Sequence, residues 1–517
     1  MRQVSLKLEN PVSPWMIYPF ACALVVIGAK CWMIARYGSP TPFWDQWDAE
    51  GAILYPKYFD GTLSFSDLIA PHNEHRILVT RLWSLLLLAL EGYWDSVLQM
   101  LANTLLIGSF VALLVVVFRP ILDRRSWIAF ALFTTTAFAL PFGWENTLNS
   151  IHSCWYFMLL FSISGLVAIV GAAAFTARWW LATLLIIASY FSMSGGLISA
   201  AAAFAVCLVQ VVVRRRTGLA ELLALAILAA LTVAMLRTIP MTGELPEYMA
   251  HSTQQFLKAV LSITAWPVAR NPISAMILCA IFIHAPAWLT SLDLIRKRPP
   301  FTDRRWLVVA LTGWVAMQTI AVAYGRAISP VSSRYVDVFA VALPLNFACL
   351  LHFLAEARAP GRRRHIALGA MALWLLLLIP GAGGTLYKHS IPEMVNKGAV
   401  GRAETENLRA YLDTKDIRVL QNKAGLDIPY PDANRLAMIV SQPVIRALLP
   451  PALVGEASAA RAQQHGLAQF TGRPIEALKN VALRWGSLLM PVGVILFVFG
   501  LAVQRRRAEA EPAPSRT

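Results

Sequence analysis

The run SVLQMLANTLLIGSFVALLVVVF, residues 96–118, carries no charged side chain and is long enough to cross the apolar core of a bilayer as one helix. Similar runs recur along the chain of 517 residues, of which 57% are hydrophobic and 14% are charged. Soluble chains are about a quarter charged, and the mean hydropathy here is +0.57. Because the strands of a membrane barrel alternate in hydropathy over about ten residues, these uninterrupted runs predict an all-α polytopic membrane protein.

Short basic clusters separate the apolar runs, which is typical of segments that stay on the cytoplasmic side. They lie at 118–125, 176–180, 211–218, 294–305, 357–365 and 503–511. If these clusters share one side, helices cross between them in pairs, which predicts about twelve transmembrane helices and cytoplasmic termini. The expected spans are 15–36, 96–118, 126–141, 153–175, 179–194, 196–213, 219–237, 273–295, 306–325, 336–355, 366–384 and 486–503. We expect a bacterial cytoplasmic (inner) membrane, and the topology accounts for the net charge of +16 without a nucleic-acid partner.

One apolar segment, 77–90, is about 14 residues long and too short to span a bilayer. We interpret it as a juxtamembrane helix on the outer face, within a first outer loop over 37–94. The predicted organisation begins with a transmembrane catalytic module at 1–384 and a small, mostly helical extracytoplasmic insertion at 385–485. A last transmembrane helix at 486–503 and a cytoplasmic tail at 504–517 follow.

Three acids follow the first span closely, in the stretch TPFWDQWDAEGAIL over 41–54. Asp45 and Asp48 stand where the chain leaves the bilayer, and Glu50 comes next. A partly desolvated carboxylate at such a boundary can take a proton from a hydroxyl nucleophile. Asp45 and Asp48 are therefore candidate catalytic residues and Glu50 a candidate pocket residue, the alternative being a solvated acidic loop.

A second polar run, His72, Asn73, Glu74, His75 and Arg76, precedes the short apolar segment. Two histidines three residues apart can share one helical face, so His72 and His75 form a weak candidate metal site. A helix N-terminus with a capping side chain is the simpler explanation. A third interpretation of this run is that His75 and Arg76 contact a lipid phosphate, while His72, Asn73 and Glu74 line an acceptor pocket.

Basic and polar residues in later outer loops complete the candidate site. Arg326 and Arg334 flank a short outer loop with Tyr335 beside them, and arginine favours two-point contact with phosphate oxygens. Anchoring to lipid headgroups is the alternative. Glu145, Asn146 and His152 are further candidates for the pocket. Arg270 and Lys258 are weaker candidates for contact with the phosphate.

The chain lacks the sequence marks of several function classes. No P-loop, GxSxG, HExxH or dinucleotide-binding motif occurs in a credible context. The six cysteines form no CxxC pair and no cysteine–histidine metal spacing. ATP-driven transport and serine hydrolysis are therefore disfavoured, and any activated substrate must be reached at the outer face or within the membrane.

The order of elements is similar to that of a known superfamily. The chain resembles GT-C integral-membrane glycosyltransferases in four features. These are acids just after the first helix, a long outer loop with a shallow helix, paired spans with an Arg-Trp-Trp turn at 178–180, and a late extracytoplasmic insertion. Aminoarabinose transferases and protein O-mannosyltransferases are members of that superfamily. The resemblance covers roughly the first 215 residues. It departs from the familiar acidic pair, because Gln46 follows Asp45, and His72–Arg76 stands where related enzymes often have Lys-Pro-Pro.

The resemblance implies a sugar donor linked to polyprenyl phosphate and a catalytic acid in the first outer loop, with Asp45 the better match and Asp48 the second. We therefore expect transfer of a sugar, with inversion, to a hydroxyl of a cell-envelope glycan, lipid or protein on the extracytoplasmic face. No organic cofactor is implied, and a divalent metal stays an open alternative. The rival functions are a transporter or flippase for lipid-linked oligosaccharides and an O-antigen polymerase or ligase.

Overall fold

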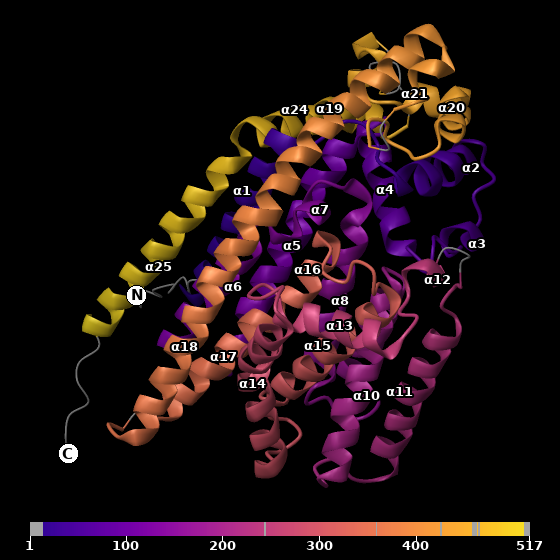
Figure 1. Cartoon of the computed structure of the whole chain (residues 1–517). Coiled ribbons are helices and arrows are strands. Elements are labelled where there is room, and N and C mark those ends of the chain that lie inside the picture. The colour runs from indigo at the N-terminus through magenta and orange to yellow at the C-terminus, as the bar shows by residue number, and fades with distance from the viewer. Residues whose placement is uncertain are drawn as a thin grey trace, which may run out of the picture.

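The computed structural model describes residues 14–510 except 242–244, 358, 424–425, 458–462 and 464–465. Across these described residues, the regular structure is helical, and the one β-bridge joins His72 to His75. Eleven of the described helices are long and apolar enough to cross a membrane. The chain is thus an all-helical, multi-pass membrane protein, and its long helices form one bundle with a cap of short helices at one end (Figure 1).

The helices of the bundle follow the apolar runs of the sequence. They are α1 (Ile17–Tyr37), α5 (Ser96–Phe118), α6 (Arg124–Ala139), α8 (Ser153–Ile169), α9 (Ala177–Tyr190), α10 (Leu197–Val212), α11 (Leu219–Arg237), α14 (Ile273–Lys297), α15 (Trp306–Gly325), α17 (Ala342–Glu356), α18 (Arg362–Thr385) and α25 (Leu489–Ala510). Residues 1–13 and 511–517, which include part of the expected cytoplasmic tail, lie outside the described residues.

The span expected at 179–194 is α9, which has 14 residues and is not among the eleven candidate spans. At about 1.5 Å per residue it is roughly 21 Å long, less than the thickness of the hydrocarbon core. After α9 the chain turns back, and Gly196 packs against the end of this helix. A Cβ atom there would lie 2.2 Å from the carbonyl carbon of Ser189. By length and hydropathy, eleven helices of the described residues qualify as spans, and α9 stays a predicted twelfth.

The first and last helices of the bundle pack together through glycine. A Cβ on Gly28 would lie 2.4 Å from the backbone nitrogen of Met490, and one on Gly493 would lie 2.6 Å from the carbonyl oxygen of Ala21. Glycine allows this close approach because it has no side chain. These pairs run in opposite directions along the two helices, so α1 and α25 are antiparallel.

The cap combines the first outer loop with the late insertion. The loop forms the π-helix η2 (Trp47–Leu54), α2 (Tyr55–Phe59), α3 (Phe65–Leu68) and α4 (Leu78–Glu91). The insertion adds α19 (Ile391–Thr414), α20 (Ala433–Ser441), α21 (Pro443–Leu448), α22 (Pro451–Val454) and α24 (Ala468–Trp485). Trp47 and Trp94 from the loop share one buried cluster with Leu408, Ile439 and Leu448 from the insertion. The two segments therefore fold as one layer (Figure 1).

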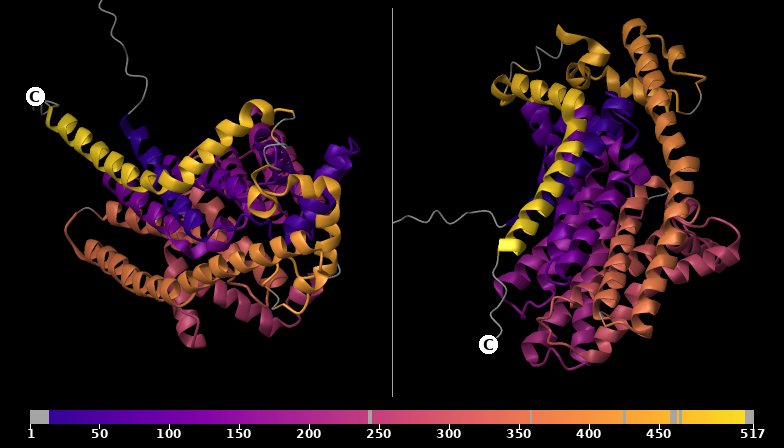
Figure 2. Two further views of the ribbon diagram at one scale, coloured as in Figure 1. Left: turned by 90° about the horizontal axis from the view of Figure 1, so that it is seen from above. Right: turned by 90° about the vertical axis from the view of Figure 1, so that its left-hand side faces the viewer.

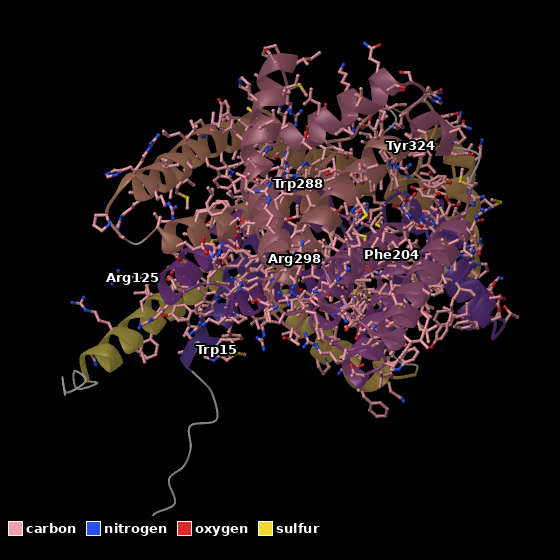
Figure 3. All side chains as sticks on the ribbon, turned by 90° about the horizontal axis from the view of Figure 1, so that it is seen from below. Trp15, Arg125, Phe204, Trp288, Arg298 and Tyr324 are labelled. Atoms are coloured by element: carbon pink, nitrogen blue, oxygen red, sulfur yellow. The ribbon has the colours of Figure 1, made fainter. Side chains whose placement is uncertain are left out.

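The insertion does not begin with a break at 384. Residues Arg362–Thr414 form a continuous helical rod of 53 residues, in which α18 passes through the π-helical turn η6 (Leu386–Ser390) into α19. Figure 2 shows this rod rising along the side of the bundle into the cap, and α24 crossing the cap before α25 descends. Figure 3 views the opposite end, where Trp15, Arg125 and Arg298 are labelled.

Candidate functional site

A cavity of about 320 Å³ lies where the cap meets the bundle. Its charged lining comes from four separate segments: Asp45 from the first outer loop, Glu145 and His152 from the turn after α6, Arg334 from α16 (Ser333–Ala340), and Glu393 and Lys397 from α19. The remaining lining residues are Phe43, Trp44, Trp144, Leu148, Asn149, Asn396, Val400 and Leu426. We call this space the acidic cavity, after Asp45.

Asp45 is placed by a tight backbone turn between α1 and η2. Trp44 adopts a positive φ of 47°, and its amide donates to the carbonyl of Pro429 at 2.8 Å. The Asp45 side chain is 47% exposed, and His72 Nε2 lies 3.7 Å from Asp45 Oδ2. Partial burial alone would raise the pKa of Asp45, but His72 above all, with His152 and Arg334, lowers it to about 2. Asp45 is thus ionised across the physiological pH range.

Arg334 lines the acidic cavity and is held in place by an ion pair and by hydrogen bonds around its backbone. Its guanidinium lies 2.8 Å from Glu145, which also accepts a hydrogen bond from Ser333 at 2.9 Å. The Asn146 amide donates to the backbone carbonyl of Arg334 at 3.0 Å and to Asp337 at 2.9 Å. Arg334 stays 46% exposed, so it retains N–H groups for an anion while its backbone is held.

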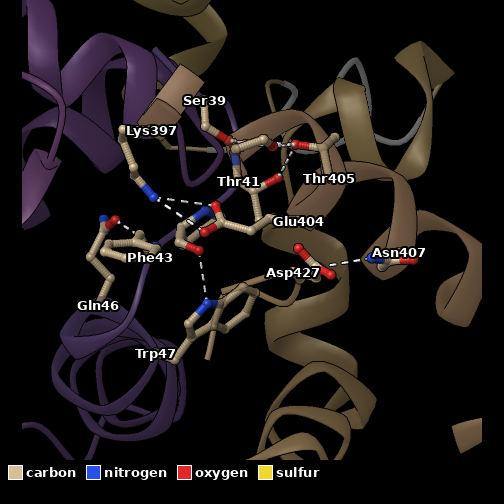
Figure 4. Close-up of polar contacts among 12 residues, drawn as sticks. Ser39, Thr41, Phe43, Gln46, Trp47, Lys397, Glu404, Thr405, Asn407 and Asp427 are labelled. Atoms are coloured by element: carbon tan, nitrogen blue, oxygen red, sulfur yellow. Dashed lines mark hydrogen bonds and ion pairs between the residues drawn. The ribbon is translucent and has the colours of Figure 1, made fainter. Parts of the chain in front are cut away.

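The helical rod contacts the residues before Asp45, as Figure 4 shows. Lys397 lies 3.2 Å from Glu404 and 3.2 Å from the centroid of the Phe43 ring. About two turns further along α19, the Thr405 hydroxyl is 2.8 Å from that of Thr41. These contacts attach α19 to the residues directly before Asp45. A cation of the late insertion therefore reaches the cavity of the first outer loop.

A second cavity, of about 440 Å³, adjoins the first. The two share Trp144, Glu145 and Glu393, and the Trp144 indole donates to Glu393 at 3.2 Å. Arg270 and His389 line this second cavity, together with hydroxyl side chains and apolar rings. Those groups are Ser262, Ser329, Ser332, Ser333, Phe142 and Trp266.

Two of the three predicted acids have structural partners and line neither cavity. Asp48 accepts hydrogen bonds from Tyr430 at 2.7 Å and from Arg435 at 2.8 Å, which fastens the insertion to η2. Glu50 is buried, and burial raises its pKa despite several donated hydrogen bonds. The donors are Ser84, Gln46, Trp94 and Gln99, at 2.5, 2.9, 2.8 and 3.3 Å. Of the three acids, only Asp45 reaches the acidic cavity.

The run His72–Arg76 forms a hairpin turn and not the first turn of a helix. The backbones of His72 and His75 exchange hydrogen bonds of 2.8 and 2.9 Å, and Asn73 takes a positive φ of 50°. The following helix, α4, begins only at Leu78. Arg76 donates to the carbonyl of Ile69 at 2.8 Å. Of this run, only His72 contacts a residue that lines the acidic cavity.

Arg326 and Tyr335 belong to a separate polar cluster. Arg326 pairs with Glu74 and donates to the Tyr335 hydroxyl at 3.1 Å, while His75 lies 3.3 Å from Glu74. Burial, with a smaller effect of the His72 charge, lowers the pKa of His75 to about 3. This cluster joins the hairpin to the start of α16. None of the residues of this cluster lines the acidic cavity.

The two histidines of the hairpin turn toward different carboxylates, His72 toward Asp45 and His75 toward Glu74. Within the described ranges, no group of three or more His, Cys, Asp or Glu side chains is arranged to hold a metal ion. Sequence reasoning missed Lys397, Glu393 and His389. They lie more than two hundred residues after Glu145, in a rod whose sequence carries no motif. The helical continuity of 362–414 was the one signal that could have placed them.

Comparison with known proteins yields no match: no family model, no curated protein and no solved structure is similar to this chain.

Proposed function

We propose that the protein is a membrane glycosyltransferase that moves a sugar from a polyprenyl-phosphate donor to an acceptor hydroxyl in the acidic cavity. The observation that carries the proposal is the position of Asp45. It is an ionised carboxylate that faces Arg334 and Lys397 across one cavity at the end of a membrane bundle. A base for a hydroxyl and cations for a phosphate are the two groups that this transfer needs.

The proposed reaction has one bond-forming and one bond-breaking step at the anomeric carbon. The acceptor oxygen attacks this carbon and its proton passes to Asp45. The bond between the carbon and the phosphate oxygen breaks, and the electron pair leaves with the lipid phosphate. Arg334 and Lys397 stabilise the charge that develops on this oxygen. Attack from the face opposite the leaving phosphate inverts the configuration.

The low pKa of Asp45 determines what the carboxylate contributes. A carboxylate with a pKa of about 2 is a weak base, so it receives the proton only as the new bond acidifies the hydroxyl. Its constant negative charge also orients the hydroxyl and stabilises positive charge on the sugar ring. His72 lowers the pKa of Asp45 and so keeps this carboxylate ionised, which makes His72 a positioning residue.

The proposed location is a bacterial cytoplasmic membrane with the cavity on the extracytoplasmic side. Antiparallel packing of α1 and α25 supports an even number of crossings, and α9 then completes twelve passes. Arg125 and Arg298, from two of the basic clusters, lie at the end of the bundle opposite the cap (Figure 3), as the positive-inside rule expects for cytoplasmic turns. Both termini are then cytoplasmic. The acceptor is a glycan, a lipid or a protein of the cell envelope.

Donor binding by the purified protein in nanodiscs tests the proposal. The ligands are radiolabelled polyprenyl-phosphate sugars carrying a pentose, a hexose or an aminosugar. We expect the wild type to bind at least one class, and Arg334→Ala to lose this binding. Arg418→Ala is the matched control, because Arg418 is 84% exposed on the insertion and lines neither cavity. Absence of wild-type binding across the panel contradicts the proposal and favours transport or a diphosphate-linked polymerase substrate.

A further inference from the structure

Helix α24 exposes an apolar stripe that no part of the described chain covers. Phe470, Leu478, Val481 and Trp485 are exposed by 73%, 63%, 55% and 52%. At about 100° per residue these positions fall within roughly 80° of one another around the helix. They therefore form one face.

The opposite face of α24 is buried. Ala468, Gly472 and Lys479 are its buried residues, and by the same rotation they lie roughly 120–160° from the middle of the exposed stripe. A Cβ on Gly472 would lie 3.1 Å from the carbonyl oxygen of Glu91, and the Thr471 hydroxyl donates to the carbonyl of Leu90 at 2.7 Å. The helix is thus pressed against the end of α4.

A buried ion cluster fixes this orientation. The Lys479 ammonium lies 2.6 Å from Glu91, 2.8 Å from the Tyr93 hydroxyl, and in contact with Asp95. Burying a cation is costly unless it is paired, so rotation of α24 that withdrew Lys479 from both acids is strongly disfavoured. The apolar stripe must therefore point away from the cap.

The chain continues from α24 directly into a membrane helix. Gly486 packs against Cys31 of α1, with its virtual Cβ 2.9 Å from the Cys31 Cβ, and α25 then runs down the bundle. Leu488, in the turn η8 (Gly486–Leu488), is 51% exposed. Trp485 thus stands one turn before a helix apolar enough to span the bilayer, a position where tryptophan lies at the membrane interface.

We propose that α24 lies in the interface of the outer leaflet, with its apolar stripe in the acyl region and Arg473 and Arg484 against phospholipid phosphates. The partner is a lipid surface, because α24 leads directly into α25, where Ile495, Val498 and Phe499 are exposed as well. By rotation, both arginines lie beside the stripe and away from the buried face, where their head groups reach the phosphates. This inference does not depend on the proposed enzymatic activity.

Site-specific labelling of the full chain in phospholipid nanodiscs tests the proposal. Leu478→Cys and Gln469→Cys each receive a polarity-sensitive fluorophore, and lipids with brominated acyl chains act as quenchers. Gln469 is the matched control, because it is exposed on the same helix about 140° from the middle of the stripe. The six native cysteines are buried, so labelling is specific.

We expect the label at 478 to show blue-shifted emission that brominated lipids largely quench, and the label at 469 to show aqueous emission with little quenching. Phe470→Cys, on the same stripe, should repeat the result if Leu478→Cys folds poorly. Aqueous, unquenched emission at both 470 and 478 overturns the proposal. Blue-shifted emission that brominated lipid leaves unchanged also overturns it, because the stripe is then covered by protein.

Discussion

Replacement of Lys479 by Met tests how the cap is attached to the last transmembrane helix. The variant keeps most of the apolar stem but removes the cation from Glu91 and Asp95. The side chains of Glu91, Asp95 and Lys479 are exposed by 0%, 6% and 10%, so the acids are left in a nearly dry environment. Removing one partner of a buried ion pair costs about 3–5 kcal/mol.

The structure favours the lower end of that range. Burial, together with the negative charge of Asp95, raises the pKa of Glu91 to about 8 even with Lys479 beside it, and loss of the cation raises this pKa further, so Glu91 is neutral at pH 7 in the variant. Asp95 still accepts hydrogen bonds from the amides of Val97 and Leu98 at 2.7 and 3.0 Å. We therefore expect a loss of about 3 kcal/mol in the free energy of unfolding.

Equilibrium unfolding in mixed micelles at neutral pH, followed by circular dichroism, measures this loss. Lys423→Met, at an exposed lysine of the insertion, is the control and should change stability by less than about 0.5 kcal/mol. The triple variant Lys479→Met, Glu91→Gln, Asp95→Asn should recover part of the loss, because no buried charge remains. A Lys479→Met protein as stable as the control would refute the reasoning.

Three further predictions concern pH and close packing. The wild type should lose stability as the pH rises from about 4.5 to about 8, because over that range the Glu91 carboxyl binds a proton in the folded state but not in the unfolded state; thermal unfolding of Glu91→Gln should lack this dependence. His72→Ala should move the acidic limb of the pH–rate profile for sugar transfer upward, because His72 is the main group that lowers the pKa of Asp45; an unchanged limb would argue against that role. Gly143→Ala should weaken donor binding, because its Cβ would lie 2.4 Å from Asp337 Oδ1 and displace the frame of Arg334. Gly313→Ala, whose Cβ would lie 3.8 Å from the end of the Met317 side chain, should bind the donor normally.

The apolar runs predicted the helical membrane fold well, because a span is specified by its own local composition. The exceptions come from backbone geometry. Gly196 packs against Ser189 at the end of α9, and hydropathy does not record such a contact. The helical rod passes through residue 384 and continues to Thr414, because a helix needs no apolar residues where it projects beyond the membrane.

The sequence predicted only those residues of the candidate site that lie in or beside short polar loops. Asp45, Glu145, His152 and Arg334 were all candidates from sequence, and the structure gathers them around one cavity. Residue type alone did not distinguish Asp45 from Asp48, because the difference lies in partners nearly four hundred residues away. Tyr430 and Arg435 occupy Asp48, whereas Asp45 faces the cavity. Lys397 came from a helix that no sequence motif marks.

The single-turnover rate of sugar transfer from bound donor, compared between wild type and Asp45→Asn, tests the central claim most directly. Asp60→Asn, at an exposed acid of the same loop, is the control. Loss of the proton acceptor should lower the rate by about 10²–10⁴-fold while donor affinity and expression stay unchanged. Transfer by Asp45→Asn at the rate of Asp60→Asn would contradict the assignment of Asp45 as the catalytic carboxylate.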